Sequence, residues 1–428
     1  MSRNVLLITY YWPPSGGAGV QRMLKFAKYL PRFKVKPYIL TVSNPTYPVY
    51  DESLKEDIPP EAAIYTSKSL EPFQLYGFLA GKTKQDVAQP TTALKQTKSL
   101  SAKAARWVRG NLFIPDARAG WLLTARKKAL DLVQQYGIEA VITSGPPHSV
   151  HFAGSYLKKK AGVRWIADFR DPWTRIHYNQ VLPRTSIAKN IDLKLERSIL
   201  QKADEVLVVS PAMANIQEQI QNRSYQVIPN GFDPDDFRVI SQEKSTSTSP
   251  KLTIRHVGSV SENSVPGGFF RALAEMGVKN SLNVEFVGSI HTGVMEQVSA
   301  FGLEAIVTHV PYLPHDEAIA KMQSADMLLL SIPKVENNEL ILTGKLFDYL
   351  AARKPILLLG PEKGDAAKII NELQAGTATG HGEITKIKTI LAKAIQKYPE
   401  PLHKIPKFSL DDHPYSRIQT AKKLSELL

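Results

Sequence analysis

Apolar residues follow two patterns that alternate along the first half of the chain. Val20, Met23, Leu24, Ala27 and Leu30 recur every three or four positions, which predicts a helix. Short continuous apolar runs lie between such periodic stretches and predict buried strands. In this half we expect strands at 4–10, 36–42, 139–143, 164–169, 205–209 and 226–229. Strands that alternate with helices indicate an α/β fold with parallel sheets.

The alternation restarts after a polar segment, which predicts a second domain. Residues 241–250 (SQEKSTSTSP) contain no core-forming side chain. Beyond them we expect strands at 252–257, 284–287, 305–309, 327–330 and 356–359. A chain of 428 residues also exceeds one ordinary core. The predicted domains are 1–238 and 239–410, and the amphipathic segment 411–428 is expected to pack back on the first.

A glycine-rich turn follows the first predicted strand and precedes the first predicted helix. It contains Ser15, Gly16, Gly17 and Gly19. Backbone N–H groups and the positive end of the dipole at a helix N-terminus favour an anion, and glycine lets a ligand approach closely. The turn therefore predicts an anion site, although two glycines are also compatible with a plain tight turn.

A later strand–loop–helix unit carries more specific side chains. After the apolar run 325–333 come Thr343, Gly344 and Lys345, and Asp348 follows one helical turn later. In parallel sheets, ligands bind beyond the carboxyl ends of the strands, where helices begin. A lysine at a helix N-terminus suits a phosphate, and a carboxylate suits sugar hydroxyls. The unit predicts a nucleotide site; the alternatives are a surface lysine and an exposed helix acid.

Composition and charge limit the class of protein. The chain has no cysteine, no apolar run long enough to cross a bilayer and no segment that resembles a signal peptide. We therefore expect a soluble, cytoplasmic protein. The net charge is +14, and residues 81–128 hold eleven Lys or Arg against two Asp. Such a stretch attracts anionic lipid, nucleic acid or phosphorylated substrates; a solvated lysine-rich face is the alternative.

The helix predicted near 100–112 is both basic and amphipathic. Its apolar residues, among them Trp107 and Leu112, alternate with Lys103 and two arginines. A helix of this kind can lie on a membrane surface. Packing against the protein's own core would produce the same pattern.

Five stretches occur in an order that is specific when they are taken together. They are YYWPPSGGAGVQR at 10–22, SGPPHSVH at 144–151 with ADFRDPW at 167–173, VIPNGFDPDDF at 227–237, HVGSV at 256–260 and TGKLFDYLAARKPIL at 343–357. With them the chain resembles the retaining glycosyltransferases of the family-4 group over nearly its whole length, apart from 43 to about 102. The resemblance implies the GT-B fold, an α/β architecture of two Rossmann-like domains facing across a cleft, with a C-terminal helix that returns to the first domain.

The same resemblance implies transfer of a sugar from a nucleotide-sugar to an acceptor, with retention at the anomeric carbon. The C-terminal domain would bind the donor and the N-terminal domain the acceptor. No metal or other cofactor is expected, because fixed positive groups and helix ends neutralise the diphosphate. The residues agree, since no acidic cluster faces a glycine turn as a metal–diphosphate site requires. The nearest cluster, 233–236, is better explained by helix capping.

On the donor side, the resemblance implies a set of contact residues. They are Gly16, Gly17, Gly258, Thr343, Gly344 and Lys345, of which the first two would contact the donor diphosphate or the acceptor. Asp348 would hold the ribose hydroxyls as the second acid of an E-x7-E pair. Glu339 would be the first acid and contact the donor sugar, although it lies nine residues before Asp348 rather than eight.

On the acceptor side, the resemblance singles out His148. Its imidazole would orient or deprotonate the acceptor hydroxyl; a cap or turn residue after two prolines is the alternative. Arg170 and Asp171 follow the strand predicted at 164–169. They would bind the acceptor, or pair with each other.

The loop after the first strand of the second domain departs from the family pattern. Relatives carry an arginine and a lysine there as a diphosphate clamp, whereas 258–266 contains no basic residue. Arg255 lies before the loop and Arg271 in the next helix. Either Lys345 and the helix dipoles alone bind the phosphates of the donor, or other residues bind the donor.

The leading hypothesis is an enzyme of cell-surface polysaccharide or glycolipid synthesis. Its acceptor would be a sugar or a lipid-linked sugar, and the basic first domain would contact the cytoplasmic face of an anionic membrane. The alternatives are a nucleotide-sugar epimerase or hydrolase of the same fold, a non-catalytic basic binding protein and an inactive scaffold. No nucleic acid is expected as a partner, because the chain shows neither an RNA-binding aromatic motif nor a DNA-reading helix.

Overall fold

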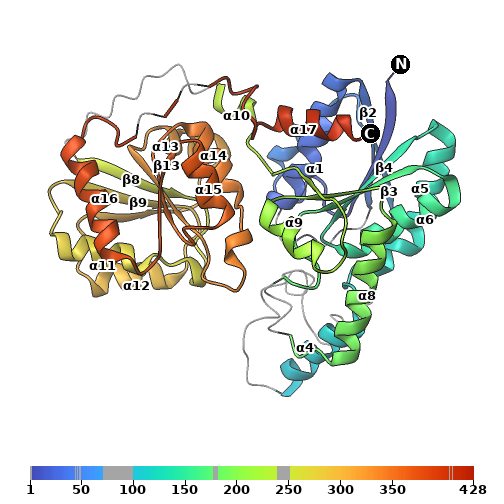
Figure 1. The fold of residues 1–428 in the computed structure, drawn as a ribbon, viewed down its shortest axis with the longest axis horizontal. Helices are drawn as coiled ribbons and strands as arrows, with labels where there is room; N and C mark the ends of the chain where they lie inside the picture. Colours follow the sequence, from blue (N-terminus) through green and yellow to red (C-terminus); the bar gives the residue numbers. More distant parts are fainter. Residues whose placement is uncertain are drawn as a thin grey trace. The chain divides into compact units, whose positions relative to one another are not determined.

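The chain forms two compact units, each built on one sheet (Figure 1). The computed structural model describes residues 2–43, 45, 47, 50–70, 100–176, 182–238, 251–403, 405–406 and 408–428. Unit 1 is Met1–Pro229 with Thr420–Leu428, and unit 2 is Asn230–Gln419. The predicted linker at 241–250 and the first part of the basic stretch, 81–99, lie outside the described residues. The predicted domain limits at 238 and 410 stay predictions.

Unit 1 contains a seven-stranded sheet in the order β3-β2-β1-β4-β5-β6-β7, and every pairing is parallel. The strands are β1 (Arg3–Thr9), β2 (Val35–Val42), β3 (Ala63–Ser67), β4 (Ala140–Gly145), β5 (Arg164–Phe169), β6 (Glu205–Val208) and β7 (Gln226–Val227). Its helices are α1 (Ala18–Tyr29), α4 (Leu100–Leu112), α5 (Leu122–Tyr136), α6 (His151–Ala161), α8 (Ser186–Lys202) and α9 (Pro211–Glu218).

Unit 2 contains a six-stranded parallel sheet in the order β10-β9-β8-β11-β12-β13. The strands are β8 (Leu252–Val257), β9 (Leu282–Val287), β10 (Val307–Val310), β11 (Met327–Ser331), β12 (Ile356–Leu359) and β13 (Gly376–Thr379). The helices are α10 (Pro234–Arg238), α11 (Gly267–Met276), α12 (Thr292–Ala300), α13 (His315–Gln323), α14 (Gly344–Ala352), α15 (Asp365–Glu372) and α16 (Ile384–Lys397). A last helix, α17 (Arg417–Glu426), begins in unit 2 and ends in unit 1.

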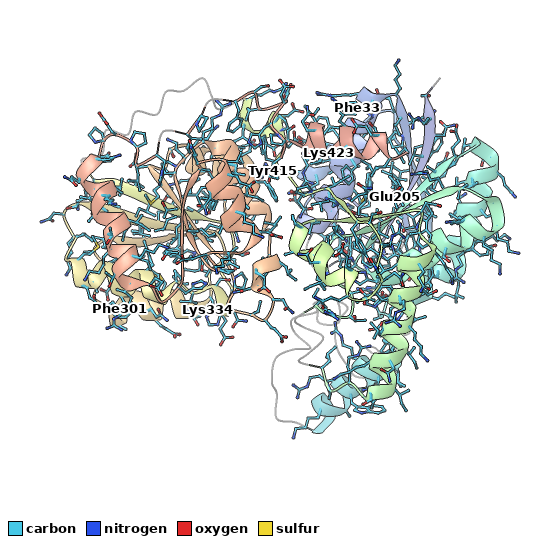
Figure 2. The ribbon with its side chains drawn as sticks, viewed as in Figure 1. Phe33, Glu205, Phe301, Lys334, Tyr415 and Lys423 are labelled. Carbon is cyan, nitrogen blue, oxygen red and sulfur yellow. The ribbon has the colours of Figure 1, made fainter. Side chains whose placement is uncertain are left out.

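Helices cover both faces of the unit 2 sheet, as a continuous apolar strand requires. One apolar cluster joins α13, α14 and α15 to one face, and another joins α11, α12 and α16 to the opposite face. Side chains fill the space between each sheet and its helices (Figure 2). Alternate residues of β11 show this division, because Leu328 belongs to the first cluster and Leu329 to the second.

The α/β prediction is confirmed, and each predicted strand is present, with ends that differ by no more than two residues from those predicted. Two strands were missed, β3 and β13. Both lie at sheet edges and neither is a continuous apolar run: β3 (AIYTS) exposes every second residue, and β13 is Gly-Thr-Ala-Thr. The pattern that identifies a central parallel strand is weak at an edge, because one side of an edge strand has no neighbour.

The strand order places the candidate residues of each unit at one point of its sheet. In a doubly wound sheet the order reverses once, and ligands bind at that reversal, beyond the carboxyl ends of the strands. The reversal lies between β1 and β4 in unit 1, and between β8 and β11 in unit 2. Gly17 follows β1 and His148 follows β4; Gly258 follows β8 and Lys345 follows β11. In each unit, the topology therefore brings residues that are far apart in sequence to the same end of the sheet.

A buried ion pair fastens α1 to the sheet of unit 1. The Arg22 Nη2 atom lies 2.7 Å from Asp168 Oδ1, and both side chains are fully buried. Arg22 Nη1 also donates to the carbonyls of Ile228 (2.9 Å) and Pro229 (3.1 Å). Burial alone would raise the pKa of Asp168, but Arg22 and the Ser144 hydroxyl outweigh it and the pKa is lowered. One guanidinium thus joins α1, β5 and the segment where unit 1 ends.

The C-terminal residues return to unit 1, as the GT-B fold implies. Arg164 Nε donates to the Leu427 carbonyl at 2.8 Å, and Arg3 donates to the Leu428 carbonyl. Across the described ranges, no helix is long and apolar enough to span a membrane.

Replacing Arg22 by methionine should destabilise unit 1 by about 3–5 kcal/mol, because Asp168 would be left as an unpaired buried carboxylate. All five tryptophans, at positions 12, 107, 121, 165 and 173, lie in unit 1, so denaturant unfolding followed by tryptophan fluorescence reports on this unit. Arg32→Met is the matched control, since Arg32 is an exposed residue near the end of α1. Equal unfolding midpoints for the two variants would show that the buried pair does not hold the unit together.

Candidate functional site

The N-terminus of α14 carries a buried hydroxyl group that makes no hydrogen bond within the described residues. Thr343 is the N-cap residue, yet its side chain makes no capping hydrogen bond. Within the described part of the chain, the Thr343 Oγ1 atom is buried and has no hydrogen-bond partner. Buried polar atoms without a partner are rare, and the first backbone N–H groups of a helix also need acceptors. This end of α14 is therefore suited to an anionic or hydroxyl-bearing ligand.

Lys345 reaches from α14 over the loop that follows β8. Its Nζ atom donates to the Ser259 carbonyl at 2.7 Å. A Cβ atom on Gly258 would lie 2.2 Å from Lys345 Cε, and Gly258 has a φ of 119°, so only glycine fits this position. Burial lowers the pKa of Lys345, while Asp348 opposes that shift. The lysine thus supplies the positive charge that the loop itself lacks.

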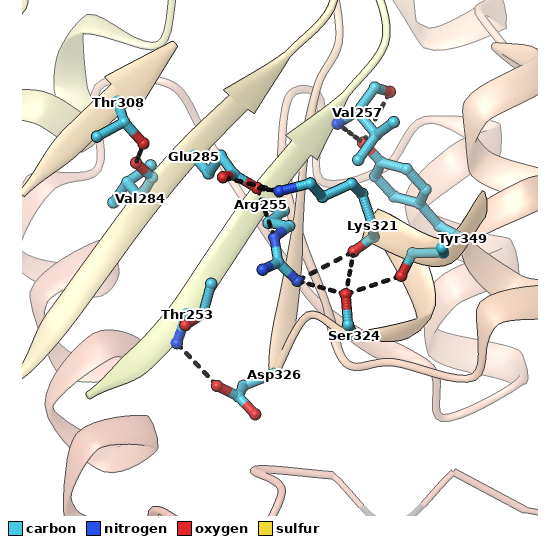
Figure 3. A network of polar contacts seen from close by, with 11 residues as sticks. Thr253, Arg255, Val257, Val284, Glu285, Thr308, Lys321, Ser324, Asp326 and Tyr349 are labelled. Atoms are coloured by element: carbon cyan, nitrogen blue, oxygen red, sulfur yellow. Dashed lines mark hydrogen bonds and ion pairs between the residues drawn. The ribbon is translucent and has the colours of Figure 1, made fainter. Parts of the chain in front are cut away.

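The other basic residues near this loop, Arg255 and Arg271, form ion pairs with acidic residues of unit 2. Figure 3 shows the contacts of Arg255. The Arg255 Nε atom lies 2.7 Å from Glu285 Oε2, and its Nη1 atom donates to Ser324 Oγ at 2.9 Å. Arg271 is exposed and pairs with Glu275 one turn along α11. Both guanidinium groups are therefore bound to carboxylates of unit 2, and Lys345 is the basic side chain that lies over the loop.

Tyr349 fixes the distance between α14 and β8 (Figure 3). The Val257 N–H donates to the Tyr349 hydroxyl at 2.8 Å, and the hydroxyl donates to the Val257 carbonyl at 3.2 Å. The ring is fully buried, and burial raises the pKa of its hydroxyl. Because Val257 directly precedes Gly258, this bond holds the loop beneath Lys345. The sequence analysis did not identify Tyr349. It could have been found as a tyrosine on the apolar face of the predicted helix.

The two acids predicted to contact the donor, Asp348 and Glu339, differ in their exposure. Asp348 is half-buried, one helical turn after Lys345 on α14. Glu339 is exposed in a single 3-10 turn, Asn338–Leu340, before that helix. Its Cα lies 3.2 Å from where a Cβ on Gly364 would be. The structure therefore brings Thr343, Gly344, Lys345 and Asp348 together on one helix end and places Glu339 on the loop before it.

In unit 1, His148 lies in the turn after β4, where Gly145 ends the strand. Only 6% of its surface is exposed, and neither ring nitrogen has a partner within the described ranges. The imidazole stacks on the Trp173 indole at 5.1 Å with an interplanar angle of 2°. Burial, with help from His151 and Arg170, lowers the pKa of His148 well below its ordinary value. The imidazole is therefore neutral at neutral pH.

Two buried carboxylates on α8 hold the segment that supports His148. Trp173 Nε1 donates to Asp192 Oδ1 at 2.7 Å, and Thr174 donates through both N and Oγ1 to Glu196 Oε2. Asp192 also pairs with Arg184 at 2.7 Å. Sequence analysis missed both acids. They could have been found from their i, i+4 spacing, because two acids one turn apart are unusual on a helix that is otherwise rich in lysine and apolar residues.

Arg170 lies against the glycine-rich turn. Its Nε donates to the Gly145 carbonyl (3.3 Å) and its Nη2 to the Pro146 carbonyl (2.5 Å). A Cβ on Gly19 would lie 2.1 Å from Arg170 Nη1, so that glycine makes room for the guanidinium. Burial lowers the pKa of Arg170, against the attraction of Asp171 and Asp168.

The other predicted residues of unit 1 differ in their exposure. Asp171 is exposed, and its negative charge favours the cationic form of Arg170. Gly17 is the N-cap residue of α1 with a φ of 99°, and nothing lies within 4 Å of a Cβ placed there. The space beside Gly17 is open, whereas Gly16 is half-buried.

One family model and a number of solved structures match the chain. The family model Glycosyltransferase Family 4 matches residues 87–236, which is most of unit 1 after β3. No curated protein sequence matches the chain.

Solved structures resemble the chain over almost its whole length. HepE of Anabaena in complex with UDP has a TM-score of 0.59 at 14% identity, covering 99% of this chain and 95% of that one. Sucrose-phosphate synthase from Thermosynechococcus elongatus also has a TM-score of 0.59, at 13% identity and 99% and 98% coverage. WaaG, a glycosyltransferase involved in lipopolysaccharide biosynthesis, has 0.53 at 13% identity and 99% and 94% coverage. The fold is that of the GT-B glycosyltransferases.

The stability of unit 1 should fall as the pH is lowered through 6.5. Burial lowers the pKa of His151 to about 3, so the fold favours its neutral form. The resulting stabilisation is complete above the ordinary value of 6.5 and is lost, at about 1.4 kcal/mol per pH unit, between 6.5 and 3. His151→Phe should make the pH dependence shallower by that slope, measured by denaturant unfolding with tryptophan fluorescence.

His291→Phe is the control for the loss of a histidine, since His291 is exposed in unit 2. A wild-type unfolding free energy that stays constant from pH 6.5 to 5 would contradict the buried neutral histidine.

Proposed function

We propose that this protein, a glycosyltransferase by its GT-B fold and its family match, transfers a sugar from a nucleotide-sugar to an acceptor hydroxyl. The transfer retains the configuration at the anomeric carbon and needs no metal ion or other cofactor. The observation that carries the proposal is the α14 terminus, where a buried unbonded hydroxyl, a lysine and an aspartate occupy the reversal point of a parallel sheet.

Each group of the α14 terminus has a role in holding the donor. Lys345 and the first N–H groups of α14 bind the diphosphate, and both stabilise the charge that develops on it as the sugar leaves. The Thr343 hydroxyl donates to a phosphate oxygen, which provides the partner that it lacks. Asp348 accepts hydrogen bonds from the ribose hydroxyls, and Glu339 contacts the sugar.

The acceptor binds to unit 1, at the end of β4. A neutral His148 accepts a hydrogen bond from the acceptor hydroxyl and orients its oxygen. The leaving phosphate then takes the hydroxyl proton, so His148 need not carry a charge at any step. Trp173 holds the plane of the imidazole, and Arg170 with Asp171 contacts the rest of the acceptor.

Uridine diphosphate sugars are the first donors to test. HepE has been crystallised with UDP and with UDP-glucose, and its fold covers 99% of this chain. The residues of the α14 terminus contact phosphate and ribose in this proposal, so they do not select the base. The choice of base and of sugar lies in the surrounding loops.

The acceptor is a sugar or a lipid-linked sugar of cell-surface polysaccharide or glycolipid synthesis. We place the enzyme in the cytoplasm, peripherally on an anionic membrane. Trp107 and Leu112 on α4 are 47% and 67% exposed, and Ile187 on α8 is 73% exposed. Asn111 joins the two helices through bonds to Pro183 and Thr185. Exposed apolar side chains on a basic helix pair suit a membrane interface.

A panel of UDP-, GDP- and ADP-sugars should raise the thermal midpoint of the purified protein for one base. A ligand present at 100 times its dissociation constant stabilises by about 2.7 kcal/mol. Asp348→Ala should abolish most of that shift, because the ribose hydroxyls lose their acceptor. Asp316→Ala on α13 is the matched control, since Asp316 is an exposed helix acid in the same unit.

Two results would contradict the proposal. One is the absence of a shift with every nucleotide-sugar; the other is an equal shift in Asp348→Ala and Asp316→Ala. A product assay without any acceptor separates transfer from epimerisation or hydrolysis, because rapid formation of an epimer or of free sugar would defeat the transferase proposal.

A further inference from the structure

A pocket of about 530 Å³ lies at the amino ends of three central strands of unit 2. Leu252 begins β8, Met327 begins β11 and Pro355 precedes β12, and all three residues line the pocket. Its opposite wall is the segment 398–403, which follows α16. The volume is within the range of pockets that hold small molecules, roughly 300–1,000 Å³.

This pocket is separate from the proposed donor site. Thr343 is the N-cap residue of α14, whereas Arg353 is its C-cap residue and lines the pocket. The two sites therefore lie at opposite ends of one helix and at opposite edges of one sheet. A ligand of the pocket is not the sugar donor.

Two half-buried side chains of opposite charge line the pocket, Asp326 and Lys354. The Asp326 Oδ2 atom accepts from the Thr253 N–H at 2.8 Å (Figure 3), and its Oδ1 atom makes no hydrogen bond to a described residue. Burial lowers the pKa of Lys354, and Asp326 opposes that shift. Within the described ranges the ammonium makes no hydrogen bond or ion pair. The lining therefore offers one hydrogen-bond acceptor and one donor to a ligand.

The charges around the pocket do not select an anion. Two acids, Asp326 and Glu400, line it together with two basic residues, Arg353 and Lys354. Helices α14 and α16 both end there, since Arg353 and Tyr398 are their C-cap residues, and the C-terminus of a helix is its negative end. An apolar ligand is also unsuitable, because it would cover Asp326 and Lys354 without bonding to them.

Apolar surface lies opposite these polar groups. Tyr398 and Leu402 line the pocket and pack against the apolar cluster beneath α11, α12 and α16. The His403 Nε2 atom lies 3.0 Å from Thr377 Oγ1 on β13, which fastens this wall to the sheet. The pocket thus combines a donor, an acceptor and an apolar wall without a net charge.

We propose that this pocket binds a neutral saccharide unit. A sugar hydroxyl donates to Asp326 Oδ1, another accepts from the Lys354 ammonium, and the C–H face of the ring packs on Tyr398. The binding itself does not rest on the proposed function. Only its use does: in a glycosyltransferase, the site would hold part of a saccharide acceptor or product outside the reaction centre.

The experiment is saturation-transfer NMR of the full chain, titrated with maltose, lactose and chitobiose as probes. We expect the wild type to bind at least one of these disaccharides. Lys354→Met and Asp326→Asn should each weaken that binding by roughly 10- to 100-fold, the range for a hydrogen bond to a charged group. The new amide in Asp326→Asn still accepts from the Thr253 N–H, but it presents an N–H group to the ligand.

Lys393→Met is the matched control. Lys393 is exposed on α16 and does not line the pocket, so this variant removes the same charge from the same side of unit 2. It should bind the disaccharide as the wild type does, and circular dichroism of each variant shows that it is folded. Excess UDP should leave the bound disaccharide in place, because the two sites are separate.

Three results would overturn the inference. They are the absence of saturation transfer to all three probes, equal binding in the wild type and Lys354→Met, and displacement of the disaccharide by UDP. Disaccharide binding that depends on Lys354, in a protein that binds no nucleotide-sugar, would leave the inference standing while the proposed function fails.

Discussion

Parallel pairing of every strand in the two sheets is the constraint on which the candidate sites depend. A parallel sheet directs all strand ends of one kind to one edge, and the connecting helices begin there. Because the order reverses once in each sheet, the loops after β1 and β4, and those after β8 and β11, diverge to opposite faces. The Gly-rich turn, the His148 turn, the Gly258 loop and the α14 terminus are the segments that follow these four strands.

Both units use glycine in the same way, to admit a long cationic side chain. Gly258 makes room for Lys345, and Gly19 makes room for Arg170. Each cation donates to backbone carbonyls next to the N-terminus of a helix, where the helix dipole opposes it. Carboxylates of the protein itself favour the charged form of each side chain, Asp348 for Lys345 and Asp171 with Asp168 for Arg170.

The orientation of His148 depends on a chain of contacts that reaches α8. His148 stacks on Trp173, Trp173 is bonded to Asp192, and Asp192 pairs with Arg184. Since Asp192 and Glu196 are one turn apart, α8 supports the segment after β5 as a rigid element. A change on α8 can therefore alter the orientation of His148 without touching a substrate.

Much of this architecture could be predicted from the sequence, and the failures have physical reasons. Central strands were evident because both of their faces are buried, whereas the edge strands β3 and β13 carry no continuous apolar run. Gly17, His148 and Lys345 could be located because they lie between a central strand and the end of the first turn of the helix that follows it. Tyr349, Asp192 and Arg22 could not, because each acts through a partner that is distant in sequence, and only the fold brings those partners within reach.

We propose that Lys345 at the α14 terminus binds the diphosphate of a nucleotide-sugar. Calorimetric titration with UDP of the wild type and of Lys345→Met tests this role. We expect the wild type to bind UDP and the variant to bind it roughly 10- to 100-fold more weakly, since one charged hydrogen bond to phosphate is lost. Equal affinities for UDP in the two proteins would contradict it.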